Sequence, residues 1–512
     1  MIQHPSAFAV SHPERPAVLA GEQVVTYAQL EDRSARVANL LHSCGVATGD
    51  HIAVLLENRP EFFDVVGAGL RIGAYVTPIN WHLTAREAAF IVADCGAQVL
   101  FASSELTSLM DDLDAPELRR RIAVGGPVEG WDDLDALIAG QPSTPPTEQC
   151  EGAWMFYSSG TTGQPKGIKP PTIGGELGAP TSFAALVAGL YGFSEESVYL
   201  CPAPLYHAAP AGWTNAVHRL GGTAVVMDRF DPLETLALIE RHRVTHVQFV
   251  PTHLVRLLKL PAEVRAGYDL SSLEVVVHAA APCPPEVKRS AIEWLGPIVH
   301  EYYSGSEGVG FCAIGPEEWL AHPGSVGKSL LGTVHILGPD GEELAPGEQG
   351  EVWFETPSRF EYHGDPAKTA AAWNDKGWSS LGDVGSLDAD GYLYLADRVS
   401  NMIISGGVNI YPREVEDVLI GHPLVDDVAV IGVPDEEMGE AVRAVVQPPA
   451  GTDPASLVAS GPELVEYCRE RLSHFKCPRS VVFVAELPRL PSGKLAKRLL
   501  PAEVLRPDRI TR

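Results

Sequence analysis

The sequence contains no apolar run that approaches the roughly 18 residues needed for a membrane-spanning helix. The segment from Met1 to Pro16 also lacks the basic patch and apolar run of a secretory signal. The eight cysteines are scattered without a C-x-x-C spacing, and the closest pair, Cys468 and Cys477, is separated by eight residues. This pattern excludes a zinc knuckle and a disulfide scaffold and favours a reducing compartment. Together these absences predict a cytoplasmic protein.

Basic residues are scarce. The sequence contains 38 lysines and arginines but 66 aspartates and glutamates, which gives a net charge of −28. Such a field repels nucleic acid and anionic lipid, so neither is expected as a partner. It also repels anionic substrates, so any phosphate or carboxylate site has to be built locally. With 45% apolar and 20% charged residues the composition is globular, and 512 residues correspond to about two to four domains.

Short apolar runs alternate with amphipathic stretches from about Thr26 to Tyr303. The runs are rich in β-branched or aromatic residues, which is typical of buried strands, and several of the stretches begin with proline or an N-cap residue. This alternation predicts an α/β fold, with a large N-terminal domain (1–397) of mostly parallel sheets covered by helices. The predicted strands are 52–56, 99–102, 154–157, 223–227, 247–250 and 275–279, and the predicted helices are 60–72, 181–191, 232–242, 252–258 and 284–294.

The composition changes after about Gly310, where proline and glycine become frequent. With hairpin-like runs at 333–337 and 350–355, this predicts a small β-rich subdomain over about 310–397. Residues 398–512 predict a compact α+β C-terminal domain. Its segments, in the order strand, helix, two strands, helix, strand, helix, are 402–405, 413–420, 428–432, 442–447, 462–472, 481–484 and 495–504.

The strongest local signal is Y-S-S-G-T-T-G-Q-P-K-G at 157–167, which follows an apolar strand. Its glycines let the backbone approach a ligand, and its hydroxyls, amides and lysine can all donate to a polyphosphate. A solvated loop is the structural alternative, since loops of this composition are common. The spacing is neither that of a P-loop nor that of a G-x-G-x-x-G loop. The segment therefore predicts a phosphate loop of another kind.

This signature resembles that of the adenylate-forming (ANL) superfamily, which includes acyl- and aryl-CoA synthetases, peptide-synthetase adenylation domains and firefly luciferase. Other segments resemble the motifs of this family in the same order along the chain. They are H-A-A-A-P at 278–282, Y-S-G-S-E at 303–307, W-S-S-L-G-D at 378–383, D-R at 397–398 with M-I-I-S-G-G-V-N-I-Y-P at 402–412, and L-P-S-G-K at 490–494. Because these motifs cover essentially the whole chain, it is identified as a member of the superfamily.

The resemblance implies that a carboxylate attacks the α-phosphate of ATP, which requires concentrated positive charge and hydrogen-bond donors. It implies ATP, Mg²⁺ and coenzyme A as cofactors, with Glu307 as the metal ligand. The implied catalytic residues are Lys494, Glu307, Thr161 and His207. The residues implied to bind ATP or coenzyme A are Ser158, Ser159, Gly160, Thr161, Thr162, Gly163, Lys166, Ala280, Ala281, Tyr303, Ser304, Gly305, Ser306, Asp383, Arg398, Gly406 and Gly407.

The same resemblance implies a mobile C-terminal domain that carries Lys494 and swings about a hinge at Ser400. Tyr303 would cover one face of adenine, and Asp383 would accept hydrogen bonds from the ribose. Plainer alternatives exist for single residues, because Asp383 alone could be a turn residue and Lys494 an exposed turn lysine near a chain end.

The candidate substrate pocket contains no acidic residue, so it suits a hydrophobic acid rather than an amino acid. This indicates an acyl-CoA synthetase acting on a fatty or aryl acid, a small-molecule partner, and leaves a homodimer open. Departures from the motifs at Ser400 and 168–180 keep a second hypothesis open, an adenylating enzyme that passes acyl-AMP to a separate partner. A catalytically silent nucleotide-binding relative is the third. The implied pocket residues are His207, Trp213, Phe249, His278, Ala279 and Gly308.

Overall fold

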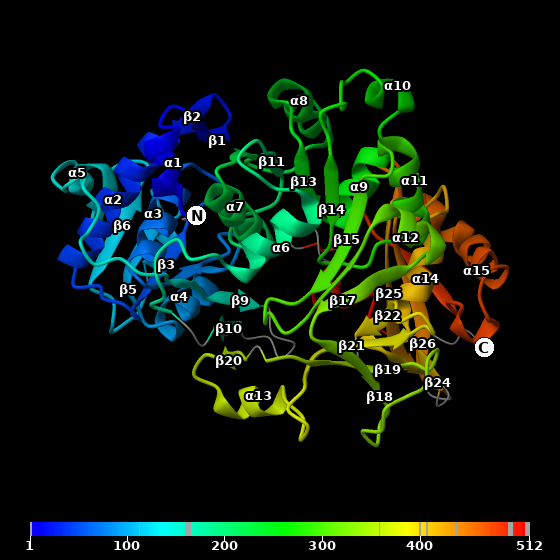
Figure 1. Cartoon of the computed structure of the whole chain (residues 1–512). Helices are drawn as coiled ribbons and strands as arrows, with labels where there is room; N and C mark the ends of the chain where they lie inside the picture. Colours follow the sequence, from blue (N-terminus) through cyan, green and yellow to red (C-terminus); the bar gives the residue numbers. More distant parts are fainter. Residues whose placement is uncertain are drawn as a thin grey trace.

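The computed structural model describes residues 3–111, 113–158, 165–170, 173–357, 359–398, 401–405, 408–435, 438–489 and 495–506. Figure 1 shows a six-stranded sheet with its helices at the N-terminal end, a thirteen-stranded sheet in the middle and a smaller C-terminal unit at the other end. The predicted α/β class, with helix-covered parallel sheets and a small α+β C-terminal unit, is confirmed. Within the described ranges, no helix has the length and apolar character needed to cross a membrane.

The six-stranded sheet is parallel throughout. Its central strand, His51–Leu55, is buried at every position, as expected for a parallel sheet covered on both faces. In sheet order the strands are β7 (Asp132–Asp133), β6 (Arg120–Val124), β5 (Ala97–Ser103), β3 (His51–Leu55), β4 (Tyr75–Pro78) and β8 (Ala153–Trp154). The accompanying helices are α2 (Tyr27–Ser43), α3 (Glu61–Arg71), α4 (Ala85–Asp94) and α5 (Leu134–Ala139).

One half of the thirteen-stranded sheet is parallel except at its edge. In sheet order its strands are β15 (Val299–Ser304), β14 (Val275–His278), β13 (His246–Phe249), β11 (Val198–Cys201), β12 (Thr223–Val226), β1 (Pro16–Ala20) and the antiparallel edge strand β2 (Gln23–Thr26). Its helices are α1 (Pro5–Ser11), α6 (Ser182–Tyr191), α7 (Ala208–Leu220), α8 (Pro232–His242), α9 (Pro251–Leu258), α10 (Ala262–Arg265) and α11 (Pro285–Leu295). Buried residues of α2, α3 and α7 belong to one apolar core, which joins the two large sheets.

The other half of the thirteen-stranded sheet is antiparallel and contains the region predicted to be β-rich. It continues the hydrogen-bonded path of the parallel half, starting next to β15. In sheet order its strands are β16 (Phe311–Ile314), β17 (Ser325–Leu331), β22 (Leu393–Arg398), β21 (Ser379–Leu387), β19 (Gly350–Glu355) and β18 (Thr333–Leu337), and its helix is α12 (Pro316–Ala321).

A separate three-stranded antiparallel sheet lies below and between the two large sheets in Figure 1. Its strands, in order, are β20 (Glu361–Tyr362), β10 (Lys166–Lys169) and β9 (Phe156–Ser158), and α13 (Pro366–Ala371) follows β20. The hairpin strands β9 and β10 flank the segment predicted as the phosphate loop.

In its described residues the C-terminal unit contains a five-stranded sheet and two α-helices. Arg413 joins it to the rest of the chain, because its Nη1 donates to the carbonyl of Leu395 in β22 at 2.8 Å. Lys259 and Asp426 form a second contact between the two parts. The strands are β24 (Val408–Ile410), β23 (Ile403–Ser405), β26 (Gly439–Gln447), β25 (Asp427–Asp435) and β27 (Ser480–Phe483), and the helices are α14 (Pro412–Leu419) and α15 (Gly461–Arg469). Short 3-10 turns cover Thr107–Met110, Pro454–Ser460, His474–Lys476 and Lys497–Leu499.

Two predicted elements are wrong. The predicted helix 495–504 is only the 3-10 turn Lys497–Leu499, because Pro501 lacks the N–H that a longer helix needs. The predicted strand 154–157 is two strands in different sheets. The chain leaves the six-stranded sheet at Met155, whose N–H still bonds the carbonyl of Val76, and then joins the small sheet at Phe156.

Candidate active site

The carboxyl ends of neighbouring parallel strands hold several of the predicted site segments. Phe249 ends β13 and is the register partner of His278, which ends β14, while Tyr303 lies near the end of the next strand, β15. His207 follows the adjacent β11 and is the N-cap of α7. Because carboxyl ends of parallel strands lie at one edge of a sheet, these segments meet there, where open α/β sheets bind ligands.

Tyr303 and Asp383 are in direct contact although 80 residues separate them in the sequence. The Tyr303 hydroxyl donates to Oδ2 of Asp383 at 2.6 Å, and Asp383 is buried. Asp383 in β21 is the register partner of Arg398 in β22. A carboxylate can accept several hydrogen bonds, so the Tyr303 hydroxyl is not the only kind of donor that Asp383 can bind.

The turn after β15 carries Glu307 and lies against Leu381 of β21. Ser304 closes the turn, because its hydroxyl donates to the carbonyl of Gly310 at 2.6 Å instead of pointing outward. A Cβ atom on Gly305 would lie 2.6 Å from Cδ2 of Leu381 and 2.9 Å from Oε2 of Glu307. A larger residue at this position would therefore require the side chains of Leu381 and Glu307 to shift. Ser306 and Gly308, also predicted for the site, are exposed in the same turn.

The phosphate-loop hairpin places two predicted residues opposite each other, since Ser158 in β9 pairs with Lys166 in β10. On the other side of β10, Tyr362 of β20 pairs with Ile168. The Lys166 Nζ lies 5.2 Å from the centre of the Tyr362 ring. Burial lowers the pKa of the Lys166 ammonium group, and the charge of Lys368 lowers it further. Two lysines therefore approach the same small region.

Glu307 is linked to this hairpin through Tyr362, whose hydroxyl donates to Oε1 at 3.1 Å. Carboxylate oxygen is a hard ligand of the kind that Mg²⁺ prefers. Among the described residues, no cluster of three or more His, Cys, Asp or Glu side chains could hold a metal by itself. A single carboxylate beside lysines fits an ion whose remaining ligands are phosphate oxygens and waters, as is usual for Mg²⁺.

The segment 279–281 has a strained backbone. Ala280 is exposed and has φ = 74°, a left-handed conformation that non-glycine residues rarely adopt. Ala279 is buried beside it, and Ala281 is half-buried. Strain of this kind costs of order 1–3 kcal/mol and is concentrated at ligand sites. It lies where the sequence predicts the second face of the adenine site.

His278 faces the interior of the protein. Its side chain is 0% exposed, and its Nε2 lies 3.5 Å from Oε2 of Glu301, the oxygen to which Lys288 donates at 2.7 Å. Burial, together with the Lys288 charge, holds the pKa of His278 well below its usual range, so the ring is neutral. The sequence reasoning missed Lys288 and Glu301. Lys288 shares the helical spacing of the buried Ala291 and Ile292, which is a signal that could have found it.

Trp213 lies in an aromatic core. It is 1% exposed, and its Nε1 donates to the Tyr302 hydroxyl at 3.2 Å. Its ring also packs near those of Tyr191 and Tyr199. His207 lies beside Tyr206, with ring centres 4.4 Å apart. Contact of these residues with an acid stays a prediction.

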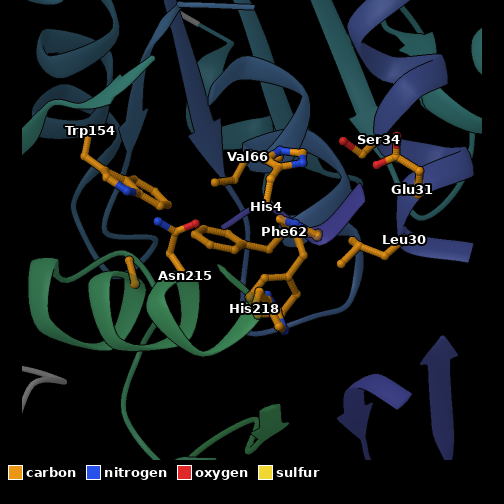
Figure 2. Close-up of a pocket in the computed structure, with 13 residues that line it drawn as sticks. His4, Leu30, Glu31, Ser34, Phe62, Val66, Trp154, Asn215 and His218 are labelled. Carbon is orange, nitrogen blue, oxygen red and sulfur yellow. The ribbon is translucent and has the colours of Figure 1, made fainter. Parts of the chain in front are cut away.

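A small pocket lies elsewhere, between α1, α2, α3, β8 and one face of α7 (Figure 2). Trp154 and Asn215 line it, and no residue of the predicted site does. The cavity measures about 40 Å³, below the roughly 300–1,000 Å³ of typical small-molecule sites. Glu31 and Ser34, which also line it, accept hydrogen bonds from Arg71. This pocket belongs to the packing between the two large sheets.

The remaining predicted residues lie outside the described part of the chain. They are Ser159, Gly160, Thr161, Thr162, Gly163, Ser400, Gly406, Gly407 and Lys494, and the side chain of Arg398 is also outside it. The sequence reasoning missed Tyr362 and Lys368. Neither had a local signal, since Tyr362 meets Glu307 across 55 residues of sequence.

Two family models match the chain, AMP-binding enzyme over residues 6–361 and AMP-binding enzyme C-terminal domain over residues 414–494. A feruloyl-CoA synthase from Amycolatopsis sp is 36% identical over 488 residues, covering 95% of this chain and 95% of the relative. The long-chain-fatty-acid–CoA ligase FadD13 from Mycobacterium tuberculosis is 33% identical, over 93% of this chain and 92% of the relative. The structure of the amide bond synthetase McbA from Marinactinospora thermotolerans is similar with a TM-score of 0.81 at 29% identity, covering 98% of both chains.

Proposed function

Because this chain belongs to the AMP-binding enzyme family, we propose that it activates a hydrophobic carboxylic acid with ATP and then joins the acid to coenzyme A. The superfamily predicted from the sequence motifs is thereby confirmed. In the first step the acid would displace pyrophosphate from ATP to form acyl-AMP. In the second, the thiol of coenzyme A would displace AMP. The chain would thus be an AMP-forming acid–thiol ligase, the class of the two curated relatives.

One observation carries this proposal. Lys166, Glu307 and the Tyr303–Asp383 pair come from three separate parts of the sequence. Lys166 and Glu307 both contact Tyr362, and Glu307 follows Tyr303 in the turn after the parallel strand β15. A site for two anions needs such a local concentration of cations and donors, particularly in a protein of net charge −28.

The proposed roles follow from these contacts. Lys166 would neutralise the β- and γ-phosphates, and Tyr303 would lie against adenine while Asp383 accepts from the ribose. Glu307 would hold Mg²⁺, which when bound neutralises phosphate charge. Lys494, from the C-terminal unit, would act at the α-phosphate during adenylation.

The acid is proposed to be apolar, either aryl or fatty. The names of the relatives support both, since one is a feruloyl-CoA synthase and one a long-chain-fatty-acid–CoA ligase. The predicted pocket residues Phe249 and Ala279 are apolar and buried. A panel of aryl and fatty acids, scored by pyrophosphate release, would separate the two classes.

A second candidate function is adenylation alone, with acyl-AMP passed to another acceptor. The structural likeness to an amide bond synthetase favours it. Ala179, near the end of the segment that departs from the family motif, accepts a hydrogen bond from Arg219, which also bonds Glu151. AMP release measured with and without coenzyme A decides between the two, since only a ligase shows release that depends on coenzyme A.

The Lys494→Ala variant tests the proposed chemistry. We expect acyl-adenylate formation to fall at least roughly 10²-fold, because a preorganised charge is lost, while thiol transfer from preformed acyl-AMP is spared. Near-normal pyrophosphate release by this variant would contradict the proposal.

We further propose a cytoplasmic location, which the eight free thiols support. A homodimer stays a prediction.

A further inference from the structure

One aromatic side chain contacts both charged groups of the proposed phosphate site. The Tyr362 hydroxyl donates to Oε1 of Glu307 at 3.1 Å, and the face of its ring lies 5.2 Å from Nζ of Lys166. A cation within about 6 Å of an aromatic ring centre is attracted to the ring. Tyr362 therefore binds the anion through its hydroxyl and the cation through its ring.

The backbone holds Tyr362 in this place. Its strand pairs with β10, with Tyr362 opposite Ile168. The Tyr362 N–H donates to Oγ1 of Thr369 at 2.9 Å, and the Thr369 hydroxyl donates to the carbonyl of Asp365 at the start of α13. Because the pairing with β10 and the hydrogen bond to Thr369 already hold Tyr362 in place, it can orient its neighbours with little further loss of conformational entropy.

Glu307 and Lys166 attract each other, since the Glu307 carboxylate acts to raise the pKa of the Lys166 ammonium. A direct ion pair between them would occupy the carboxylate needed for a metal and the ammonium needed for phosphate. The Tyr362 hydroxyl binds only Oε1, and among the described residues no hydrogen bond occupies Oε2. Up to three acceptor positions of the carboxylate are then left for a cation.

We propose that Tyr362 is a positioning residue that keeps Glu307 and Lys166 apart and orients both for the Mg²⁺–ATP complex. This inference rests on the proposed function, because it assigns Tyr362 a task in the same site. It adds a residue that lies outside the loop signature and about 55 residues from Glu307.

The test is calorimetric titration of ATP into Tyr362→Phe, with Mg²⁺ and separately with EDTA. The variant keeps the ring and loses only the hydroxyl. We expect about tenfold weaker binding of ATP in Mg²⁺, in line with the loss of a hydrogen bond to a charged group. In EDTA we expect unchanged affinity. In Tyr362→Leu, which also loses the ring, ATP should bind more weakly in both conditions.

Tyr392 provides a matched control. Its hydroxyl also donates to a glutamate, Glu318, at 3.1 Å, and Lys328 lies 4.3 Å from its ring centre, outside the proposed site. Tyr392→Phe should therefore lose comparable thermal stability but bind ATP normally in both conditions.

A second measurement is the Mg²⁺ dependence of pyrophosphate release. We expect Tyr362→Phe to need several-fold more Mg²⁺ for half-maximal rate and to recover most of its kcat when Mg²⁺ is saturating. If the variant binds Mg²⁺–ATP as wild type does, or loses affinity equally in EDTA, the positioning role is wrong. A wild-type protein that does not bind Mg²⁺–ATP would instead overturn the proposed function, and the inference with it.

Discussion

Lys288 and Glu301 form an ion pair inside the protein, with Nζ donating to Oε2 at 2.7 Å and side chains that are 0% and 8% exposed. Burial raises the pKa of Glu301 and lowers that of Lys288, while their mutual attraction opposes both shifts. Each charge is tolerated only because the other is present. The pair lies against His278, so it supports the strand end that leads into 279–281.

Removing one partner of this pair should be severely destabilising. We expect Lys288→Met to lower the free energy of unfolding by about 3–5 kcal/mol, because Glu301 is left buried and unpaired. The double variant Lys288→Met/Glu301→Leu should recover most of the loss. Urea unfolding measures the free energy of unfolding of the single and the double variant. Arg120→Met, which removes an exposed pair with Asp132, should cost less than about 1 kcal/mol. Equal losses of unfolding free energy in Lys288→Met and Arg120→Met would contradict this expectation.

The left-handed backbone of Ala280 predicts an unusual response to glycine. Ala280→Gly should be neutral or up to roughly 1 kcal/mol stabilising, because relief of strain outweighs the extra entropy of the unfolded chain. Ala281→Gly removes the same methyl group where φ is not positive, and it should destabilise by roughly 0.5–1 kcal/mol. Thermal unfolding without ligand compares the stabilities of the Ala280→Gly and Ala281→Gly variants. A larger loss at position 280 than at 281 would show that no strain is stored there.

The buried His218 predicts loss of stability in mild acid. Its Nε2–H donates to the carbonyl of Ala17 at 2.9 Å, and burial lowers its pKa to about 4. An unfolded histidine titrates near pH 6.5, so the unfolded chain binds the proton first as pH falls. The stabilisation is complete above about pH 6.5 and is lost towards pH 4, by up to about 1.4 kcal/mol per pH unit.

Urea unfolding of His218→Gln across this range measures the contribution of the histidine. The variant should show a shallower dependence on pH than wild type, whereas His12→Gln, at an exposed position, should not. An unchanged slope in His218→Gln would exclude His218 as a source of the acid sensitivity.

Two lysines in β10 should differ sharply in function. Lys166→Met should reduce pyrophosphate release roughly 10²-fold, since a charge proposed to bind the phosphates is lost. Lys169→Met should leave the rate close to that of wild type, because the Lys169 ammonium lies 4.5 Å from the Tyr75 ring instead. Steady-state assays at saturating acid compare the two variants. Similar losses in both would mean that β10 as a whole, and not Lys166, supports activity.

Local patterns predicted the elements whose signals are short-range. The strands Thr333–Leu337 and Gly350–Glu355 and the helix Pro232–His242 have the predicted bounds, because apolar alternation and an N-terminal proline mark them in the sequence. The strand predicted at 154–157 is divided between two sheets, because its apolar run contains no sign of the change of sheet at Met155. The helix predicted at 495–504 does not form, because Pro501 cannot donate the backbone hydrogen bond that a helix interior needs.

The motifs located the candidate site along the chain but not its internal contacts. The Tyr303–Asp383 and Tyr362–Glu307 hydrogen bonds join residues 80 and 55 positions apart. Such contacts depend on how the sheets come together, and a single sequence holds no record of that. Lys288 is the exception, because a lysine at the spacing of a buried helical face indicates a buried partner.

The smallness of the β9-β10-β20 sheet has a consequence for local unfolding. Its strands contain three, four and two residues, and among the described residues they pair only with one another. So few ladder bonds give a low local opening free energy, whereas the central strands of the large sheets open only with global unfolding. Backbone amides of 166–169 should therefore exchange with deuterium much faster than those of His246–Phe249. A nucleotide that binds the hairpin would be reported first by slower exchange at this sheet, well before any change in overall stability.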